Sequence, residues 1–131
     1  MDKEIYSELS INTFKDLLNV LDQSDPNENA AIIIKLGASW CGPCERIASI
    51  VHDNFNRLPK EFVCFDLDVD ENLEIFMAFK KYKMAPTIPT ILAYIKTPNR
   101  DMKNWYVPQL SYVGSDNTQL NNFFLKLKEN K

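Results

Sequence analysis

Two cysteines three positions apart, Cys41 and Cys44, are the residues whose type and spacing most clearly indicate chemistry. Gly42 and Pro43 stand between them, an apolar strand-like run precedes them, and a helix-like stretch follows. A Cys-x-x-Cys pair in that setting is typical of a dithiol that cycles with a disulfide. Residues three apart on a helix have Cβ atoms about 5–6 Å apart, so a disulfide forms there with little backbone movement.

Their places on the expected helix predict different roles for the two thiols. Cys41 falls at the helix N-terminus, where unpaired backbone N–H groups and the helix dipole favour a thiolate. Pro43 suits the first turn, because its missing N–H would have no partner there, and Gly42 keeps the approach to Cys41 open. We therefore expect Cys41 to be the nucleophile and Cys44 the resolving thiol that breaks the mixed disulfide.

Two other interpretations of the pair stay open. A zinc site needs further cysteine or histidine ligands at matching spacing, and the candidates are Cys64, inside an apolar strand, and the lone His52. The pair could also be structural and incidental. We expect Cys64 to be a buried core residue and His52 an exposed helix position. The redox group is then the Cys41–Cys44 pair itself, with no metal and no further cofactor.

Length and composition favour a single domain over residues 1–131. With 45% hydrophobic and 25% charged residues, a chain of 131 residues buries a core without metals or disulfides. A net charge of −3 and well-spread lysines argue against nucleic acid or an anionic membrane as partners. We expect a cytoplasmic monomer, since the N-terminus shows no secretory signal and the longest apolar run is too short to span a bilayer.

Hydrophobic periodicity predicts strands that alternate with helices. Strands are expected at 4–9, 31–36, 62–69, 90–95 and 106–113. Helices are expected at 11–21, 44–58 and 72–82, with a last one capped by Asp116 or Asn117. The third helix should carry Leu73, Phe76, Phe79 and Tyr82 on one face. This order predicts an α/β fold with a mixed central sheet of about five strands, flanked by about four helices on both faces.

Over nearly its whole length the chain resembles the thioredoxin family. The matching segments, in the family's order, are Trp40-Cys41-Gly42-Pro43-Cys44, Asp68-Val69-Asp70, Ile88-Pro89-Thr90 and Val113-Gly114. The resemblance implies a thioredoxin fold with a cis peptide bond before Pro89, for which Pro86 is the rival position. It also implies reduction of protein disulfides, with electrons from a thioredoxin-reductase-like donor. The implied substrate-docking rim is Trp40, Val69, Thr87, Ile88, Pro89, Val113 and Gly114.

The residues expected beneath the dithiol depart from the family pattern. Lys35 stands where the family has a buried aspartate, and Asp66 stands where it has a lysine. An unpaired lysine is costly to bury, so we expect Lys35 and Asp66 to meet, unless Lys35 reaches solvent at the strand end. A Lys35 ammonium would stabilise thiolates and make the disulfide more oxidising, whereas a neutral Lys35 would serve Cys44 as a base. Glu45, in place of a family lysine, would oppose the thiolate.

Two further points bear on function. The segment 97–112 is longer than the family's hairpin and carries Trp105, Tyr106 and Tyr112, which either pack locally or form a surface for a partner or a second copy. The alternatives to a reductase are a low-turnover binding or scaffold module and a more oxidising, isomerase-like donor. The Gly-Pro pair between the cysteines favours the reductase by resemblance.

Overall fold

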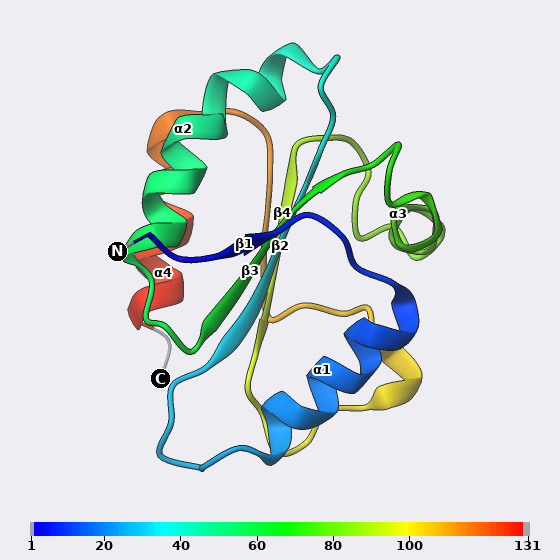
Figure 1. Cartoon of the computed structure of the whole chain (residues 1–131), viewed down its shortest axis with the longest axis vertical. Helices are drawn as coiled ribbons and strands as arrows, with labels where there is room; N and C mark the ends of the chain where they lie inside the picture. The colour runs from blue at the N-terminus through cyan, green and yellow to red at the C-terminus, as the bar shows by residue number, and fades with distance from the viewer. Residues whose placement is uncertain (1, 130–131) are drawn as a thin grey trace.

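A five-stranded mixed sheet separates two layers of helices in the computed structural model, which describes residues 2–129 (Figure 1). The strand order across the sheet is β1-β3-β2-β4-β5. The predicted α/β class and alternation of elements are confirmed, with one added 3-10 helix, η1. Along the chain the elements are β1 (Ile5–Tyr6), α1 (Ile11–Gln23), β2 (Ala31–Gly37), α2 (Gly42–Arg57), β3 (Phe62–Asp68), α3 (Leu73–Lys81), β4 (Thr90–Ile95), η1 (Met102–Asn104), β5 (Leu110–Val113) and α4 (Asn117–Glu129).

β2 occupies the centre of the sheet because nearly all of its side chains are apolar. Every residue from Ala31 to Gly37 is buried. β2 pairs in parallel with β3 and antiparallel with β4, while β1 and β5 form the two edges. A strand buried on both faces is what the almost continuous apolar run predicted.

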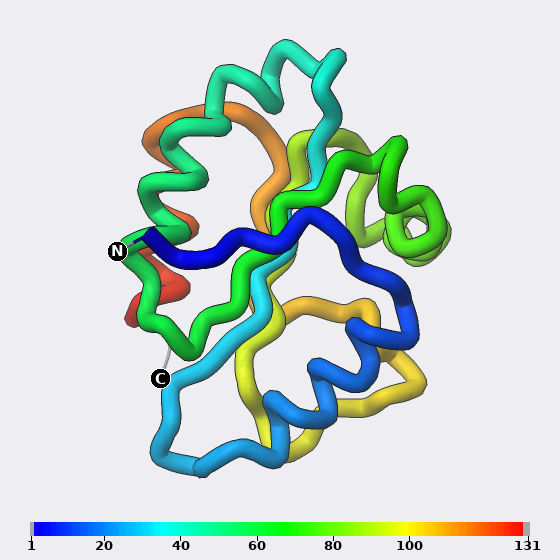
Figure 2. Tube along the Cα trace, viewed as in Figure 1, coloured from blue at the N-terminus to red at the C-terminus, as the bar shows by residue number. Residues whose placement is uncertain are grey.

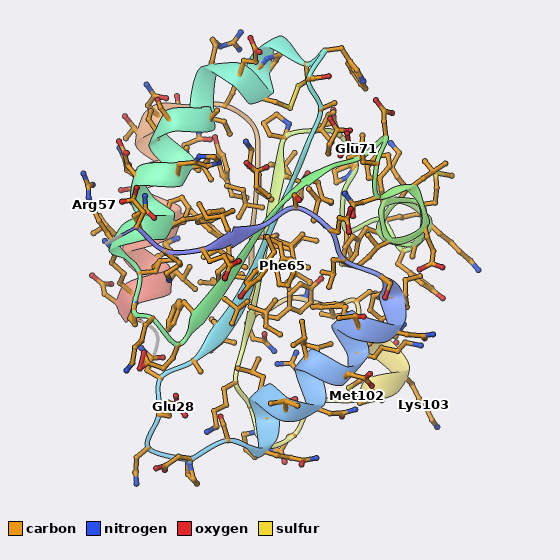
Figure 3. The ribbon with its side chains drawn as sticks, in the orientation of Figure 1. Glu28, Arg57, Phe65, Glu71, Met102 and Lys103 are labelled. Atoms are coloured by element: carbon orange, nitrogen blue, oxygen red, sulfur yellow. A yellow bond between two sulfur atoms is a disulfide. The ribbon has the colours of Figure 1, made fainter. Side chains whose placement is uncertain are left out.

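Each face of the sheet is covered by one pair of helices (Figure 1). α1 and α3 pack on one face through side chains such as Phe14 and Phe79. α2 and α4 pack on the other face through side chains such as Val51 and Phe124. Figure 3 shows side chains filling both interfaces, with Phe65 of β3 in the layer shared with α1 and α3.

Three connections meet at the end of the sheet where β2 runs into α2 (Figure 2). They are the segment after β2, the loop before β4 and the turn after β5, and the segment after β3 lies beside the first of them. Backbone hydrogen bonds hold these segments: Val69 N–H, just after β3, donates to Gly37 O at 2.9 Å, and Gly114 N–H donates to Pro89 O at 3.2 Å. The carboxyl ends of parallel strands are where α/β sheets place functional residues.

Both edge strands are shorter than predicted. β1 covers Ile5–Tyr6 instead of 4–9, and β5 begins at Leu110 instead of 106. Pro108 lacks an N–H and cannot donate to a sheet ladder. Just before β5, a side chain also bonds to β4: Gln109 Oε1 accepts the Ile95 N–H at 2.7 Å.

The aromatic residues of segment 97–112 pack largely on the domain itself. Trp105 is 7% exposed and its ring lies 5.9 Å from that of Phe14. Tyr106 stacks on Tyr82 with ring centroids 3.8 Å apart, and its carbonyl accepts the Tyr94 hydroxyl at 2.8 Å. Local packing therefore accounts for the longer segment, the first of the two interpretations left open by the sequence.

The packed face of α3 differs from the predicted one at Leu73, which is 57% exposed, while Ile75 is buried. The other predicted members are in place: Phe79 is buried, and Phe76 and Tyr82 are partly buried against the same core. The helix begins one residue later than predicted, because Asn72 is its N-terminal cap. Asn72 is itself buried, and its side chain accepts the Leu9 N–H at 3.0 Å and donates to Ser7 O at 3.1 Å. These bonds tie the start of α3 to the segment after β1, and Leu73 faces solvent.

Ile75→Ala tests this corrected face. Removing a fully buried aliphatic side chain should lower the free energy of unfolding by about 2–5 kcal/mol, through lost burial and the cavity left behind. Leu73→Ala, the matched control on the same helix, should change it by less than about 0.5 kcal/mol. Urea unfolding curves of the two variants measure both effects. Equal losses would contradict the assigned face.

The third cysteine, Cys64, lies in the middle of β3 and is free and buried. It pairs in register with Ile33 of β2 and Ile5 of β1. Burial raises the pKa of the Cys64 thiol to about 12, with Lys3 nearby acting weakly in the opposite direction. The prediction of a core cysteine is confirmed.

This raised pKa predicts an unreactive thiol. At pH 8 Cys64 stays protonated in the folded protein, so Ellman's reagent should find no fast-reacting thiol while Cys41 and Cys44 are paired. In urea, burial is lost, the thiol returns to its ordinary pKa, and one thiol per chain should react. Rapid labelling of the folded, oxidised protein at Cys64 would contradict the burial of this side chain.

Candidate active site at the Cys41–Cys44 disulfide

The two cysteines form a disulfide directly after the carboxyl end of β2. Their Cα atoms are 5.2 Å apart, within the range that disulfide geometry requires. Cys41 is 6% exposed and Cys44 is 3% exposed. Cys41 N–H donates to Ala38 O at 3.2 Å, and this turn carries the chain from β2 into α2. The structure thus brings together the two residues predicted to form the redox pair.

Cys41 is the N-terminal cap of α2. Its Sγ accepts the Cys44 N–H at 3.2 Å, the contact that a capping oxygen makes in other helices. The helix begins at Gly42, two residues before the predicted start, because Gly42 and Pro43 take up the first turn and a proline is tolerated there. An N–H donor and the helix dipole both point at Cys41 Sγ, and both stabilise a thiolate on that atom.

The loop before β4 lies at the same end of the sheet as the disulfide, because Thr90 at the start of β4 pairs with Leu36 near the end of β2. The Ile88–Pro89 peptide bond is cis, so Pro89 rather than Pro86 is confirmed as the position of the cis bond. Pro89 O accepts the N–H of Gly114 at 3.2 Å. Gly114 has φ of +134°, and a Cβ there would lie 3.1 Å from Tyr112 Oη, so only glycine fits without strain.

The predicted docking rim divides into exposed and buried members. Trp40 is 67% exposed and Val113 is 38% exposed. Thr87 is exposed and Ile88 half-buried, whereas Pro89 is buried. Val69 is 3% exposed, so its side chain is buried and forms no part of an exposed rim.

A hydrogen bond orients Trp40. Its Nε1–H donates to Asp70 Oδ2 at 2.8 Å. The Asp70 N–H in turn donates to Asp68 Oδ1 at 2.8 Å. The sequence analysis included Asp70 in a matching segment but gave it no role, because the contact joins residues 30 positions apart.

Lys35 and Asp66 meet, as predicted. They are register partners on the parallel strands β2 and β3, and Lys35 Nζ lies 3.7 Å from Asp66 Oδ1. The Lys35 side chain is 6% exposed and that of Asp66 is 28% exposed. Lys35 therefore does not reach solvent at the strand end, the alternative that the sequence left open.

Both charged residues border a hollow of about 270 Å³ beneath the resolving cysteine. Glu45 and Asp68 also line it, together with Cys44. Gly37 opens this space: a Cβ there would lie 3.4 Å from Cys44 Sγ and 3.7 Å from Lys35 Cε. Cys44 therefore shares this hollow with a lysine and three carboxylates, of which the sequence analysis had given a role to Asp66 and Glu45 but not to Asp68.

His52 is a member of this charged group that the sequence analysis missed. Its Nε2 lies 2.7 Å from Asp66 Oδ2, while the side chain is 47% exposed as predicted. Recognising the contact requires knowing which turn of α2 crosses β3. The available signal was the spacing of eight residues from Cys44, about two helical turns, which keeps both near one side of α2.

Neither His52 nor Cys64 joins the cysteine pair. His52 contacts Asp66, and Cys64 lies inside the sheet. Within residues 2–129, no group of three or more histidine, cysteine, aspartate or glutamate side chains is arranged to hold a metal ion. No helix in that range is long and apolar enough to cross a membrane.

Comparison with known proteins agrees with this geometry. The family model described as Thioredoxin matches residues 9–104. Thioredoxin 1 of Plasmodium falciparum is 31% identical over 74 residues, 50% of this chain and 70% of that protein. Thioredoxin-1 of Drosophila melanogaster is 26% identical over 118 residues, 90% of this chain and 95% of that protein. For several other thioredoxins the aligned segment spans about half of their length.

The fold comparison covers almost the whole chain. The crystal structure of Malassezia sympodialis thioredoxin superposes with a TM-score of 0.65 at 18% identity, covering 98% of this chain and 95% of that one. At this identity the likeness shows the fold alone, and it confirms the predicted thioredoxin fold. The family match extends over most of the chain, from α1 to η1 and across the disulfide. The chain belongs to the thioredoxin family.

Proposed function

We propose that this protein reduces disulfide bonds in other proteins by thiol–disulfide exchange. The observation that carries the proposal is the position of Cys41, whose Sγ caps α2 and accepts the Cys44 N–H at 3.2 Å. A sulfur held there is stabilised as an anion when the disulfide is reduced. Membership of a family of disulfide oxidoreductases supports the same assignment.

The reaction follows from the two positions on α2. The Cys41 thiolate attacks one sulfur of a substrate disulfide, that bond breaks, and the second substrate sulfur leaves as a thiolate that takes up a proton. Cys44 then loses its proton and attacks Cys41 Sγ. The mixed disulfide breaks, the substrate leaves fully reduced, and the Cys41–Cys44 disulfide forms. Two electrons pass to the substrate, and a reductase of the thioredoxin-reductase type would return them.

The surface around the disulfide supports a polypeptide substrate. Trp40 and Val113 are exposed apolar side chains, and the exposed Thr87 and half-buried Ile88 directly precede the cis-proline Pro89. Exposed apolar groups of this kind favour protein contacts. A cytoplasmic location suits such a reductant, because thiols are kept reduced there.

We further propose that Lys35, Asp66 and Glu45 tune the dithiol. The ammonium of Lys35 lies in the hollow beneath Cys44 and favours thiolates over thiols. That effect stabilises the reduced form and makes the disulfide more oxidising. Asp66 offsets part of the positive charge at 3.7 Å, and Glu45 acts against a nearby anion. A strong Lys35 effect would move the protein toward the isomerase-like alternative.

Cys41→Ser tests the proposed reaction. Because the attacking sulfur is lost, dithiothreitol-driven reduction of insulin should fall to the uncatalysed rate, as measured by turbidity. Cys64→Ala, which removes the cysteine outside the site, should retain the wild-type rate. Cys44→Ser should accumulate a mixed disulfide with insulin on Cys41. Absence of activity in the wild-type protein would contradict the proposal and favour the binding-module alternative.

Lys35→Met tests the proposed tuning. Loss of the ammonium should raise the titration midpoint of the Cys41 thiolate, followed by absorbance at 240 nm, by on the order of one unit. The same substitution at Lys60, exposed before the other end of β3, should leave the midpoint unchanged. An unchanged midpoint in Lys35→Met would remove Lys35 from the proposed mechanism without affecting the assignment of Cys41.

A further inference from the structure

The carboxylate of Asp66 has two partners rather than one. Oδ1 lies 3.7 Å from Lys35 Nζ, and Oδ2 lies 2.7 Å from His52 Nε2. The bridge therefore joins a buried lysine on β2 to a surface histidine on α2 through an aspartate on β3. The tuning proposal uses the contact between Lys35 and Asp66. His52 extends this series of side-chain contacts to the surface.

The pleat of the sheet explains why these three residues meet. Successive side chains of a strand point to opposite faces. Phe65 packs in the layer of α1 and α3, so Asp66 points to the face that α2 covers (Figure 3). Ile34 packs with the same layer as Phe65, which puts Lys35 on the α2 face as well. His52 lies on α2 above them.

His52 is held in place at one end and open to water at the other. Its ring lies against the buried ring of Phe55, with centroids 6.5 Å apart and planes 19° apart. Exposure rises steadily along the series: Cys44 is 3% exposed, and the side chains of Lys35, Asp66 and His52 are 6%, 28% and 47% exposed. An imidazole exchanges protons with water and changes charge between about pH 5 and 8.

We propose that His52 is a positioning residue whose protonation, transmitted through Asp66, sets the charge balance beneath Cys44. With neutral His52, the Asp66 carboxylate offsets the Lys35 ammonium. With protonated His52, the carboxylate is shared between two cations, and the group gains one positive charge. The positive charge of Lys35 is then offset less by Asp66, and thiolates of the reduced dithiol are more stable. The inference rests on the proposed dithiol chemistry and adds a pH-dependent control to it.

The charged surroundings of His52 come from three elements. β3 contributes Asp66 and β2 contributes Lys35. α2 itself contributes Asp53, the next residue, and Glu45 two turns away at the hollow. α4 meets this part of α2 through neutral contacts, Asn54 with Asn121 and Phe55 with Phe124. Of these groups, Asp66 makes the direct contact and so dominates the response.

Linkage gives the sign of the effect. A thiolate on Cys41 adds a negative charge when the disulfide is reduced, and this charge favours protonated His52. His52 should therefore bind its proton more tightly in the reduced protein than in the oxidised one. Cys41 and His52 are eleven residues apart, about 17 Å along α2. At that separation, with screening, we expect a difference in proton affinity of at most about two-fold.

His52 is the chain's single histidine, which makes the test direct. Its imidazole proton resonances can be followed by NMR from pH 4.5 to 9 in the oxidised and the dithiothreitol-reduced wild-type protein. We expect a higher titration midpoint in the reduced form. Asp66→Asn should remove most of the difference between the two forms. Asp53→Asn, which removes a carboxylate from the adjacent exposed position, should preserve the difference.

His52→Gln gives a second measurement that does not depend on Asp66→Asn folding. Glutamine retains a polar amide but cannot titrate. Equilibration of the dithiol with a glutathione redox buffer should show a more oxidising disulfide at pH 6 in wild type than in His52→Gln, with the two converging above pH 8. Equal midpoints in oxidised and reduced protein, or identical redox equilibria at every pH, would overturn the inference.

The assay of insulin reduction separates this inference from the proposed function. If the protein reduces insulin but the His52 midpoint is the same in the oxidised and reduced forms, the proposed function stands and the control by His52 is overturned. If the His52 midpoint differs between the oxidised and reduced forms but the protein reduces no insulin, the coupling stands and the reductase assignment is overturned. In each case one result decides one proposal.

Discussion

The structure depends on β2 being buried on both faces and paired on both edges. This constraint places its carboxyl end against the N-terminus of α2, so the chain turns once and delivers Cys41 to a helix cap. The same pairing sets Lys35 opposite Asp66 in the register with β3. A shift of that register by one residue would point one of the two side chains to the other face. Backbone pairing therefore determines both the location of the dithiol and the charges beneath it.

A buried lysine makes the neighbouring residues interdependent. An ammonium with no counter-charge is strongly disfavoured in an apolar sheet, so Asp66 serves the fold as well as the site. Asp66 is only partly buried, and its second oxygen is free to take another partner from α2. The ion pair thus leaves its carboxylate only partly buried, where His52 of α2 reaches it.

Much of the fold and the centre of the site could be predicted from local sequence. The apolar run of β2 and the Cys-Gly-Pro-Cys spacing carry their signal within a few residues, whereas the cis bond before Pro89 was predicted from the family resemblance. The contact of Lys35 with Asp66 followed from the cost of burying a charge together with the family alignment. Leu73 was misplaced because its helix is oriented by Asn72, which bonds to a segment more than 60 positions earlier. His52 was missed for the same reason: its partner lies on another element, and helical periodicity alone does not say which strand a turn crosses.

Local sequence and tertiary contacts correspond to two different properties of the site. The type of reaction is set by groups close in sequence, since Cys41 Sγ, the Cys44 N–H and the first turn of α2 suffice to stabilise a thiolate. In the proposed tuning, the redox poise is set by groups that only the tertiary structure assembles, from β2, β3 and α2 around one hollow. On that proposal, a substitution in this group leaves the exchange chemistry in place and changes how readily the disulfide accepts electrons. Proteins with one fold can therefore share a motif and differ in whether they reduce or oxidise their substrates. The motif supplies the nucleophile, and the surrounding charges decide which redox form is favoured.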